Sequence, residues 1–139
     1  MVQLIVGNKG KGKTKIILDK VNAEVLDCLG TVVYLDKSTK HMFDLNNKVR
    51  LINVPDFDVN GTDGFLGFIS GIISQDRDLE KVFIDSFLVL ADIENKDVAA
   101  ALRKIDNLSR KFSIDFIISM SVEEDELPEE FKDMVIASL

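Results

Sequence analysis

The residues best suited to chemistry lie near the start of the chain, where glycines and lysines alternate before a threonine. Residues 7–14 read Gly-Asn-Lys-Gly-Lys-Gly-Lys-Thr, which places Gly7, Gly12, Lys13 and Thr14 at the spacing Gly-x-x-x-x-Gly-Lys-Thr. Glycines allow backbone conformations in which successive N–H groups turn inward around an anion. This pattern predicts a loop that binds phosphate groups, with Lys13 at the β- and γ-phosphates and the Thr14 hydroxyl on Mg²⁺.

The segments on either side of the loop support this prediction. An apolar run at residues 2–6 leads into it, and residues 14–29 carry apolar side chains at helical spacing, with Gly30 as a stop signal. A helix that begins at the loop would present its free N–H groups to the same phosphates. Lys9 and Lys11 either add positive potential there or point to solvent. We expect the nucleotide to contact Gly7, Asn8, Lys9, Gly10, Lys11, Gly12, Lys13, Thr14 and Lys15.

A second candidate ligand for magnesium is Asp85. It follows Lys81-Val82-Phe83-Ile84, a run with the length of a buried strand. In proteins with this type of loop, an aspartate at the end of such a strand holds the metal. We therefore predict that Thr14 and Asp85 bind Mg²⁺ together. The alternative is that Asp85 only caps the next element.

The elements that must position these residues alternate along the chain. Most of the apolar runs are continuous, as in strands covered on both faces of a sheet. This alternation predicts an α/β fold with a parallel, doubly wound sheet in one domain over residues 1–139. The predicted strands are residues 2–6, 31–35, 49–54, 81–85 and 114–120. The predicted helices cover residues 14–29, a segment capped by Thr62, a segment that includes Val98 to Leu108, and a segment that begins at Pro128.

Two segments allow more than one interpretation. Residues 38–48 could form a short helix, which we favour, or a hairpin strand at 41–45 before the third strand. Gly64, Gly67 and Gly71 share one helical pattern. Each glycine costs up to about 1 kcal/mol relative to alanine in a helix, which suggests a packing reason. We favour close packing of this helix on the sheet over a groove for a partner helix.

Composition and charge limit the classes of function. The chain has 139 residues and a net charge of −7, which argues against a nucleic-acid partner. The single cysteine, Cys28, cannot form an internal disulfide, and we expect it in the core; with His41 as the other soft ligand, a structural zinc site is not expected. No apolar run approaches the roughly 20 residues of a membrane span. With no leader pattern at its start, we expect a cytoplasmic protein.

The two motifs resemble the Walker A and Walker B motifs of the P-loop NTPase superfamily. Ile84-Asp85-Ser86-Phe87-Leu88 is similar to the second motif of the RecA and KaiC group, and Ile117-Ile118-Ser119-Met120-Ser121 resembles its strand-end sensor, with Ser119 beside the γ-phosphate. The resemblance implies a three-layer α/β/α fold with a mainly parallel five-stranded sheet in the order 5-1-4-3-2. The chain is also similar to a small bacterial family of ATP-binding proteins, some of which carry the label of the motor PilT.

The resemblance also directs the search for catalytic residues, because the RecA-like group places its catalytic glutamate after the third strand. Asp56 and Asp58 occupy that region here, and we take them, with Lys13, as the catalytic candidates. Asp36, at the end of the second predicted strand, is a weaker candidate that would suit a kinase better. No arginine finger can be assigned from the sequence, although a neighbouring subunit could supply one.

These residues predict a protein that binds ATP with Mg²⁺ and acts as a weak ATPase or a nucleotide-dependent switch. The alternatives are a small-molecule or nucleoside kinase and an assembly module that holds ATP without hydrolysing it. The sequence lacks an Asn-Lys-x-Asp signature, which disfavours GTP. Expected partners are the nucleoside triphosphate and either further copies of this chain or another protein. Whether the chain is an ATP hydrolase stays open.

Overall fold

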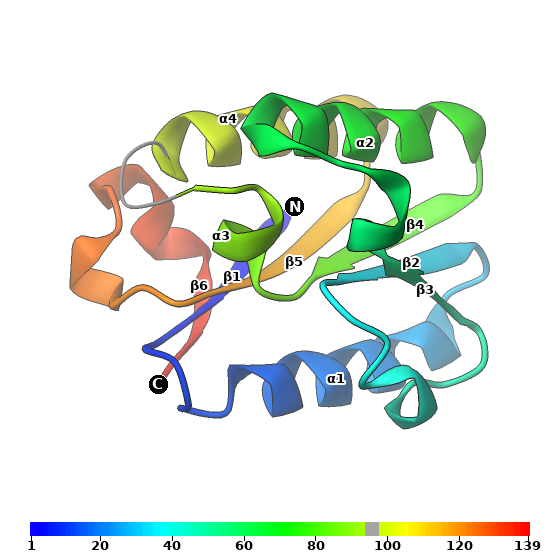
Figure 1. Cartoon of the computed structure of the whole chain (residues 1–139), viewed down its shortest axis with the longest axis horizontal. Helices are drawn as coiled ribbons and strands as arrows, with labels where there is room; N and C mark the ends of the chain where they lie inside the picture. The colour runs from blue at the N-terminus through cyan, green and yellow to red at the C-terminus, as the bar shows by residue number, and fades with distance from the viewer. Residues whose placement is uncertain (94–97) are drawn as a thin grey trace.

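One parallel sheet between two helical layers forms the fold (Figure 1). The computed structural model describes residues 1–93 and 98–139, and in them six strands pair side by side in the order β3-β2-β4-β5-β1-β6. Every neighbouring pair runs parallel. The carboxyl ends of all six strands therefore lie at one edge of the sheet. The strands are β1 (Val2–Val6), β2 (Thr31–Asp36), β3 (Val49–Asn53), β4 (Leu79–Ile84), β5 (Asp115–Met120) and β6 (Val135–Ser138).

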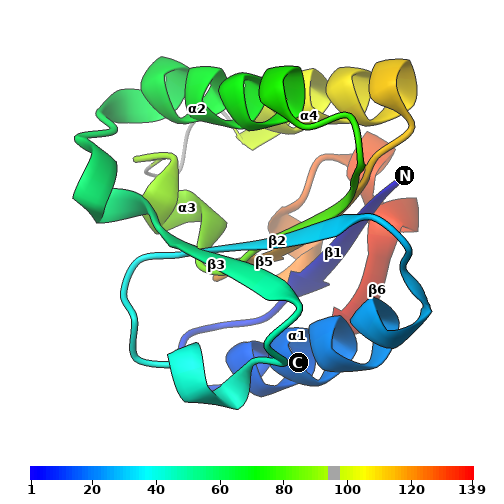
Figure 2. The same cartoon turned by 90° about the vertical axis from the view of Figure 1, so that its right-hand side faces the viewer.

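Helices cover both faces of the sheet. Figure 2 shows α1 (Lys13–Glu24) on one face and α2 (Gly61–Gln75) with α4 (Val98–Phe112) on the other. A short helix, α3 (Phe87–Leu90), follows β4 on the side of α2 and α4. Side chains of α1 such as Ile17 and Val21 pack on Tyr34 and Phe83 of the sheet, while the larger core lies under α2 and α4. The predicted three-layer arrangement is confirmed.

The predicted strand number and order are wrong. The sheet has a sixth strand because residues 135–138, expected in a helix after Pro128, form β6 beside β1. Only a 3-10 helix, Glu129–Met134, precedes that strand. The strand is short and half exposed, and its apolar residues Val135, Ile136 and Ala137 follow the predicted helix start at Pro128 so closely that they were assigned to that helix.

The second cause of the wrong order is the position of β3. It lies at the outer edge beyond β2, so that β2 is the strand that pairs with β4. The other five strands lie in the order β6-β1-β5-β4-β2, which becomes 5-1-4-3-2 when they are renumbered along the chain. The prediction had counted the edge strand β3 among the five.

Several local predictions also change. Residues 38–48 contain only a 3-10 turn, Met42–Asp44, so neither the favoured short helix nor the alternative hairpin strand at 41–45 is present. In α2, Gly67 and Gly71 are exposed with open space where a side chain would be, so the expected close packing on the sheet is wrong. Thr62 lies inside that helix and does not cap it; its hydroxyl donates to the carbonyl oxygen of Ala91.

Two further expectations concern Cys28 and the membrane. Cys28 is half-buried and packs against the core under α1, which agrees with a role in packing. Among residues 1–93 and 98–139, no helix has both the length and the apolar character needed to cross a membrane.

Candidate functional site

The glycine-rich loop connects β1 to α1, and its glycines have backbone conformations that residues with a side chain rarely adopt. Gly10 and Gly12 have φ values of 81° and 93°, in the left-handed region that other residues avoid. Gly7 has a φ of 145° and lies against Leu139, the residue after β6. A β-carbon at Gly7 would lie only 2.9 Å from the Leu139 carbonyl oxygen. Gly12 precedes α1 without a side-chain cap. The first N–H groups of this helix are therefore free to bind an anion.

The carboxylate of Asp85 is the centre of the polar network next to the loop. It is almost fully buried at the end of β4. Its Oδ2 accepts hydrogen bonds from the Thr14 hydroxyl at 3.1 Å and, more weakly, from the Tyr34 hydroxyl at 3.4 Å. Its Oδ1 accepts one from the Ser119 hydroxyl at 2.6 Å. Hydroxyl groups on α1, β2 and β5 thus hold the Asp85 carboxylate in one orientation, beside the threonine of the loop.

The amine of Lys13 lies within the loop. Its Nζ donates hydrogen bonds to the carbonyl oxygens of Gly7 at 2.8 Å and Asn8 at 2.9 Å. Burial lowers the pKa of Lys13 below its ordinary value, and the Asp85 carboxylate opposes that shift. Burial thus disfavours the charged form of the Lys13 amine, and a phosphate group at the loop would supply negative charge that stabilises that form.

Asp36 lies at the end of β2, next to Asp85. The two strand ends are joined because Asp85 N donates to the carbonyl oxygen of Leu35 at 3.1 Å. Asp36 is 2% exposed, and its Oδ1 accepts a hydrogen bond from Lys37 N at 2.7 Å. Its Oδ2 is buried without a hydrogen-bond partner in the described part of the chain. Burial, assisted by the Asp85 charge, raises the pKa of Asp36.

The free oxygen of Asp36 is the observation that fits a bound metal. A buried carboxylate oxygen normally finds a partner, and one without a partner needs an explanation. Magnesium usually keeps several of its water ligands, and these donate hydrogen bonds to neighbouring carboxylates. The Thr14 hydroxyl and the Asp85 and Asp36 carboxylates are oxygen donors of the kind that Mg²⁺ prefers. The residues present therefore fit this ion.

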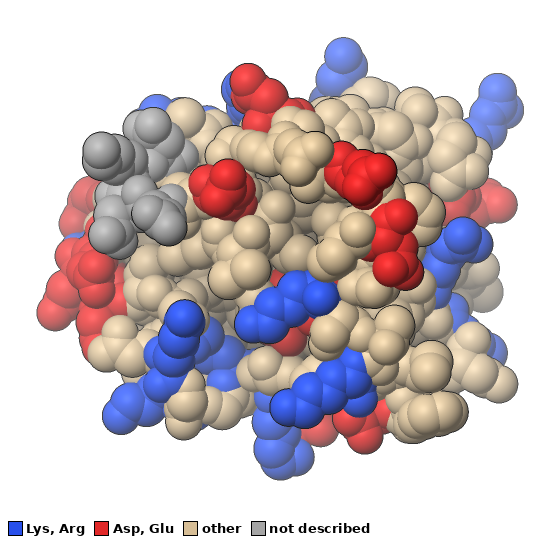
Figure 3. Space-filling view, viewed as in Figure 1, with Lys and Arg blue, Asp and Glu red and all other residues tan. Residues whose placement is uncertain are grey.

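A cavity of about 700 Å³ opens over the loop and the strand ends. In Figure 3, lysine and arginine side chains gather in the lower half of the face, where the loop and α1 lie, while acidic side chains dominate above. Apolar residues of α3 and of the turn after it form the opposite wall. The cavity is lined by Lys9, Gly10, Gly12, Lys13, Thr14, Lys37, Asp85, Ser86, Leu88, Val89, Asp92, Ile93, Ser119 and Ser121.

Most of the predicted site residues meet in this cavity. It brings together the loop, Asp85 and Ser119. Asn8 and Lys15 make other contacts, since the Asn8 amide donates to Glu123 and Lys15 pairs with Asp19. Lys11 is exposed in the loop and does not line the cavity, whereas Lys9 does.

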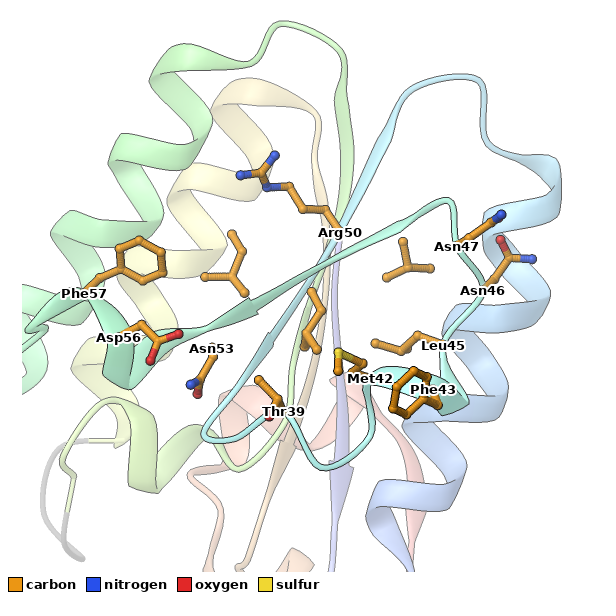
Figure 4. Close-up of a pocket in the computed structure, with 13 residues that line it drawn as sticks. Thr39, Met42, Phe43, Leu45, Asn46, Asn47, Arg50, Asn53, Asp56 and Phe57 are labelled. Carbon is orange, nitrogen blue, oxygen red and sulfur yellow. The ribbon is translucent and has the colours of Figure 1, made fainter.

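The structure does not bring Asp56 or Asp58 to the cavity. Both are exposed and follow β3, the edge strand, which β2 separates from β4. Asp56 instead lines a second cavity, of about 560 Å³, along the outer edge of β3. Figure 4 shows Asp56 and Phe57 at one end of that cavity and Phe43 and Leu45 at the other.

Sequence reasoning missed two members of the site and ranked a third too low. Tyr34 was taken only as part of a strand, although its buried hydroxyl contacts Asp85. Lys37 belongs to neither sequence motif, yet it lines the cavity. Asp36 was ranked behind Asp56 and Asp58. The available signal was the alternation Tyr34-x-Asp36, which places both side chains on one face of the strand next to β4, the strand that leads into Asp85.

Comparisons with known proteins place the fold. No family model matches the chain, and no curated protein matches it. Two solved structures are similar: the flagellar accessory protein FlaH from Methanocaldococcus jannaschii, with a TM-score of 0.61 and 15% identity, and the KaiC-like protein PH0186 from Pyrococcus horikoshii OT3, with a TM-score of 0.63 and 15% identity. The matches cover 93% and 87% of this chain, but only 63% and 62% of those proteins. The chain therefore shares its fold with these two proteins.

Proposed function

We propose that this protein binds ATP with Mg²⁺ and hydrolyses it slowly. The observation that carries the proposal is the hydrogen bond from Thr14 to Asp85, which joins the end of the loop to the end of β4 inside one cavity. The two residues were 71 positions apart in the sequence and were predicted separately. Their contact is the arrangement that a shared magnesium site requires.

Each part of the site has a physical task in binding. The N–H groups of the loop and of the first turn of α1 surround the phosphates, and the Lys13 amine supplies the positive charge nearest to them. Thr14 and Asp85 would hold Mg²⁺, which when bound neutralises charge on the β- and γ-phosphates. Ser119 keeps the Asp85 carboxylate in place from the neighbouring strand. Tyr34 does the same from β2.

Asp36 replaces Asp56 and Asp58 as the candidate for positioning the attacking water. Its free Oδ2 lies next to Asp85 on the side of β2, where the γ-phosphate end of the nucleotide would lie. In the hydrolysis step, a water oxygen bonds to the γ-phosphorus while the bond to the bridging oxygen breaks, and ADP leaves with that electron pair. Asp36 would orient the water, whose proton passes to the released phosphate or to solvent.

A second candidate function is an assembly module that holds ATP without turnover. The observation in its favour is that no arginine of the described residues lines the cavity. In addition, one of the two similar structures is a flagellar accessory protein, and the other is named KaiC-like. An accessory role with a protein partner, in the cytoplasm where ATP is present, is compatible with slow hydrolysis as well as with none.

The test is release of phosphate from ATP by the purified chain, with Lys13→Ala as the disabling variant and Lys48→Ala as its matched control. Lys48 is an exposed lysine before β3, outside the cavity. We expect slow turnover in the parent and in Lys48→Ala, and none in Lys13→Ala. Equal turnover in all three proteins would refute the proposal. An ATP-dependent rise in melting temperature without phosphate release would favour the assembly module.

A further inference from the structure

Three lysines line the cavity in the described part of the chain, and only one of them comes from outside the loop. Lys9 and Lys13 belong to the loop, whereas Lys37 follows β2. The positive charge of Lys37 therefore reaches the cavity from a different element. The phosphate-loop motif does not require this lysine, and neither sequence motif includes it.

The order of the strands places Lys37 at one particular end of the nucleotide. From the loop outward, the strand ends follow the order β1, β5, β4 and β2. Asp85, at the end of β4, would hold the Mg²⁺ ion of the proposed function, and in proteins with this type of loop that ion binds the β- and γ-phosphates. Lys37 lies beyond it, at the end of β2. The terminal phosphate is the part of ATP that lies on this side of the metal.

The backbone of Lys37 is anchored while its side chain is free. Its N–H donates to the buried Asp36 carboxylate at 2.7 Å, which fixes the turn out of β2. Within the described part of the chain, the Lys37 amine forms no ion pair, in contrast to Lys15 and Lys20 on α1. An anchored lysine whose amine has no carboxylate partner is suited to meet an anionic ligand.

No arginine takes this role within the described residues. Arg50 lines the separate cavity at the edge of β3, and Arg103 and Arg110 pair with Glu130 and Asp106. Arg77 lies before β4, at the opposite edge of the sheet from the loop. Lys37 is thus the cation of the described chain, outside the loop, that can reach the terminal phosphate.

We propose that Lys37 binds the γ-phosphate and makes the site prefer a nucleoside triphosphate over a diphosphate. This inference rests on the proposed function, because it concerns the same cavity. The amine stays protonated and forms a charge-assisted hydrogen bond with a γ-phosphate oxygen that ADP lacks. ADP retains its contacts with the loop and with Lys13, so its affinity does not depend on Lys37. The residue therefore determines specificity, and it lets the protein distinguish the nucleotide before hydrolysis from the product.

The experiment compares the dissociation constants of MgATP and MgADP by isothermal titration calorimetry. The variants are Lys37→Ala, Lys37→Arg and, as a matched exposed lysine outside the cavity, Lys40→Ala. We expect Lys37→Ala to weaken MgATP binding about tenfold and to change MgADP binding less than about twofold, as a charge-assisted contact at an accessible site implies. Lys37→Arg should retain the preference, and Lys40→Ala should match the parent.

Two outcomes would overturn the inference: an unchanged ratio of MgATP to MgADP affinity in Lys37→Ala, or an equal loss of both affinities. A melting curve of each variant shows whether it is folded. Lys13→Ala in the same titration separates the two proposals. If Lys13→Ala abolishes binding while Lys37→Ala keeps the parent ratio, only the role of Lys37 fails. If Lys13→Ala binds MgATP like the parent, the proposed function itself fails.

Discussion

Two cavities of similar size differ in their linings in the described part of the chain, and of these two only one has residues suited to phosphate chemistry. The cavity at the loop, of about 700 Å³, receives Lys13, Lys37 and the carboxylate of Asp85 from three different elements. The cavity at the edge of β3, of about 560 Å³, is lined mostly by apolar and amide side chains. Parallel strands explain the difference, because they deliver the residues that follow them to one edge of the sheet. Size alone does not identify a site.

The two cavities also differ in how their carboxylates are held. Asp36 and Asp85 are buried next to each other at the ends of paired strands, whereas Asp56 is exposed beside Phe57. Burial limits the motion of a side chain and lowers the local dielectric, so that a buried carboxylate acts more strongly on a charge nearby. The comparison predicts that substitution of Asp36 or Asp85 lowers the rate of hydrolysis, whereas substitution of Asp56 does not.

The largest expected difference is in turnover. Asp36→Asn should lower the rate of phosphate release by about 30-fold or more, because a small misplacement of a reacting group can cost about 100-fold in rate. Asp56→Asn should change the rate by less than about twofold. Steady-state phosphate release at saturating MgATP measures both. If the loss appears in Asp56→Asn and not in Asp36→Asn, the edge cavity contributes to catalysis and the comparison fails.

A smaller effect is expected when the support of Asp85 is removed. Ser119 accepts a hydrogen bond from Ser86 N at 2.9 Å and donates to Asp85. Ser119→Ala should raise the Mg²⁺ concentration needed for half-maximal ATP binding by about tenfold, since a hydrogen bond to a charged group contributes roughly 1.5–3 kcal/mol. Ser138→Ala, at the exposed end of β6, is the control. A magnesium dependence unchanged by Ser119→Ala would show that Asp85 needs no support.

Asp36 also links stability to pH. Its pKa is raised in the folded protein, so the folded state binds the proton more tightly than the unfolded state does. Ionisation of Asp36 therefore destabilises the fold as pH rises from the unfolded pKa, about 3.9, through the higher folded pKa. In EDTA near pH 7, Asp36→Asn should melt about 3 °C above the parent. That gap should close toward pH 4.

The control for the pH experiment is Asp56→Asn, which is expected to melt with the parent at every pH because Asp56 is exposed. A difference between Asp36→Asn and the parent that stays constant between pH 4 and pH 7 would contradict the linkage. It would mean that the side chain affects stability through packing rather than through its charge.

The smallest effect is expected at the edge cavity. Phe43 is 92% exposed, so Phe43→Ser should change the free energy of unfolding by less than about 0.5 kcal/mol and should leave MgATP affinity unchanged. Chemical denaturation and calorimetry measure these quantities. A loss of MgATP affinity in Phe43→Ser would show that the two cavities are coupled.

The sequence allowed the site to be predicted where residue type and spacing are tied to local geometry. The loop has such a link, because glycines at fixed intervals permit the left-handed turns at Gly10 and Gly12. Asp85 has one as well, since it follows a buried strand. The predictions failed where the partner lies far along the chain. Whether β2 or β3 pairs with β4 depends on contacts between distant strands, and both are apolar runs of similar length.

The choice between β2 and β3 as the neighbour of β4 determines which residues are the catalytic candidates. With β3 counted next to β4, Asp56 and Asp58 are expected at the site. Because β2 takes that position, Lys37 lines the cavity and Asp36 is buried beside Asp85. The strand β6 was missed for another reason. Its burial alternates over only four residues, and the acidic residues before Met134 resemble the start of a helix.

The most direct test of the central claim is calorimetric titration of ATP into the purified chain, with Mg²⁺ and with EDTA, for the parent and for Asp85→Asn. The account predicts saturable binding that Mg²⁺ strengthens about tenfold or more in the parent, and no strengthening by Mg²⁺ in Asp85→Asn, which would still bind ATP weakly through the loop. Absence of ATP binding by the folded parent, or the same magnesium effect in Asp85→Asn, would contradict it.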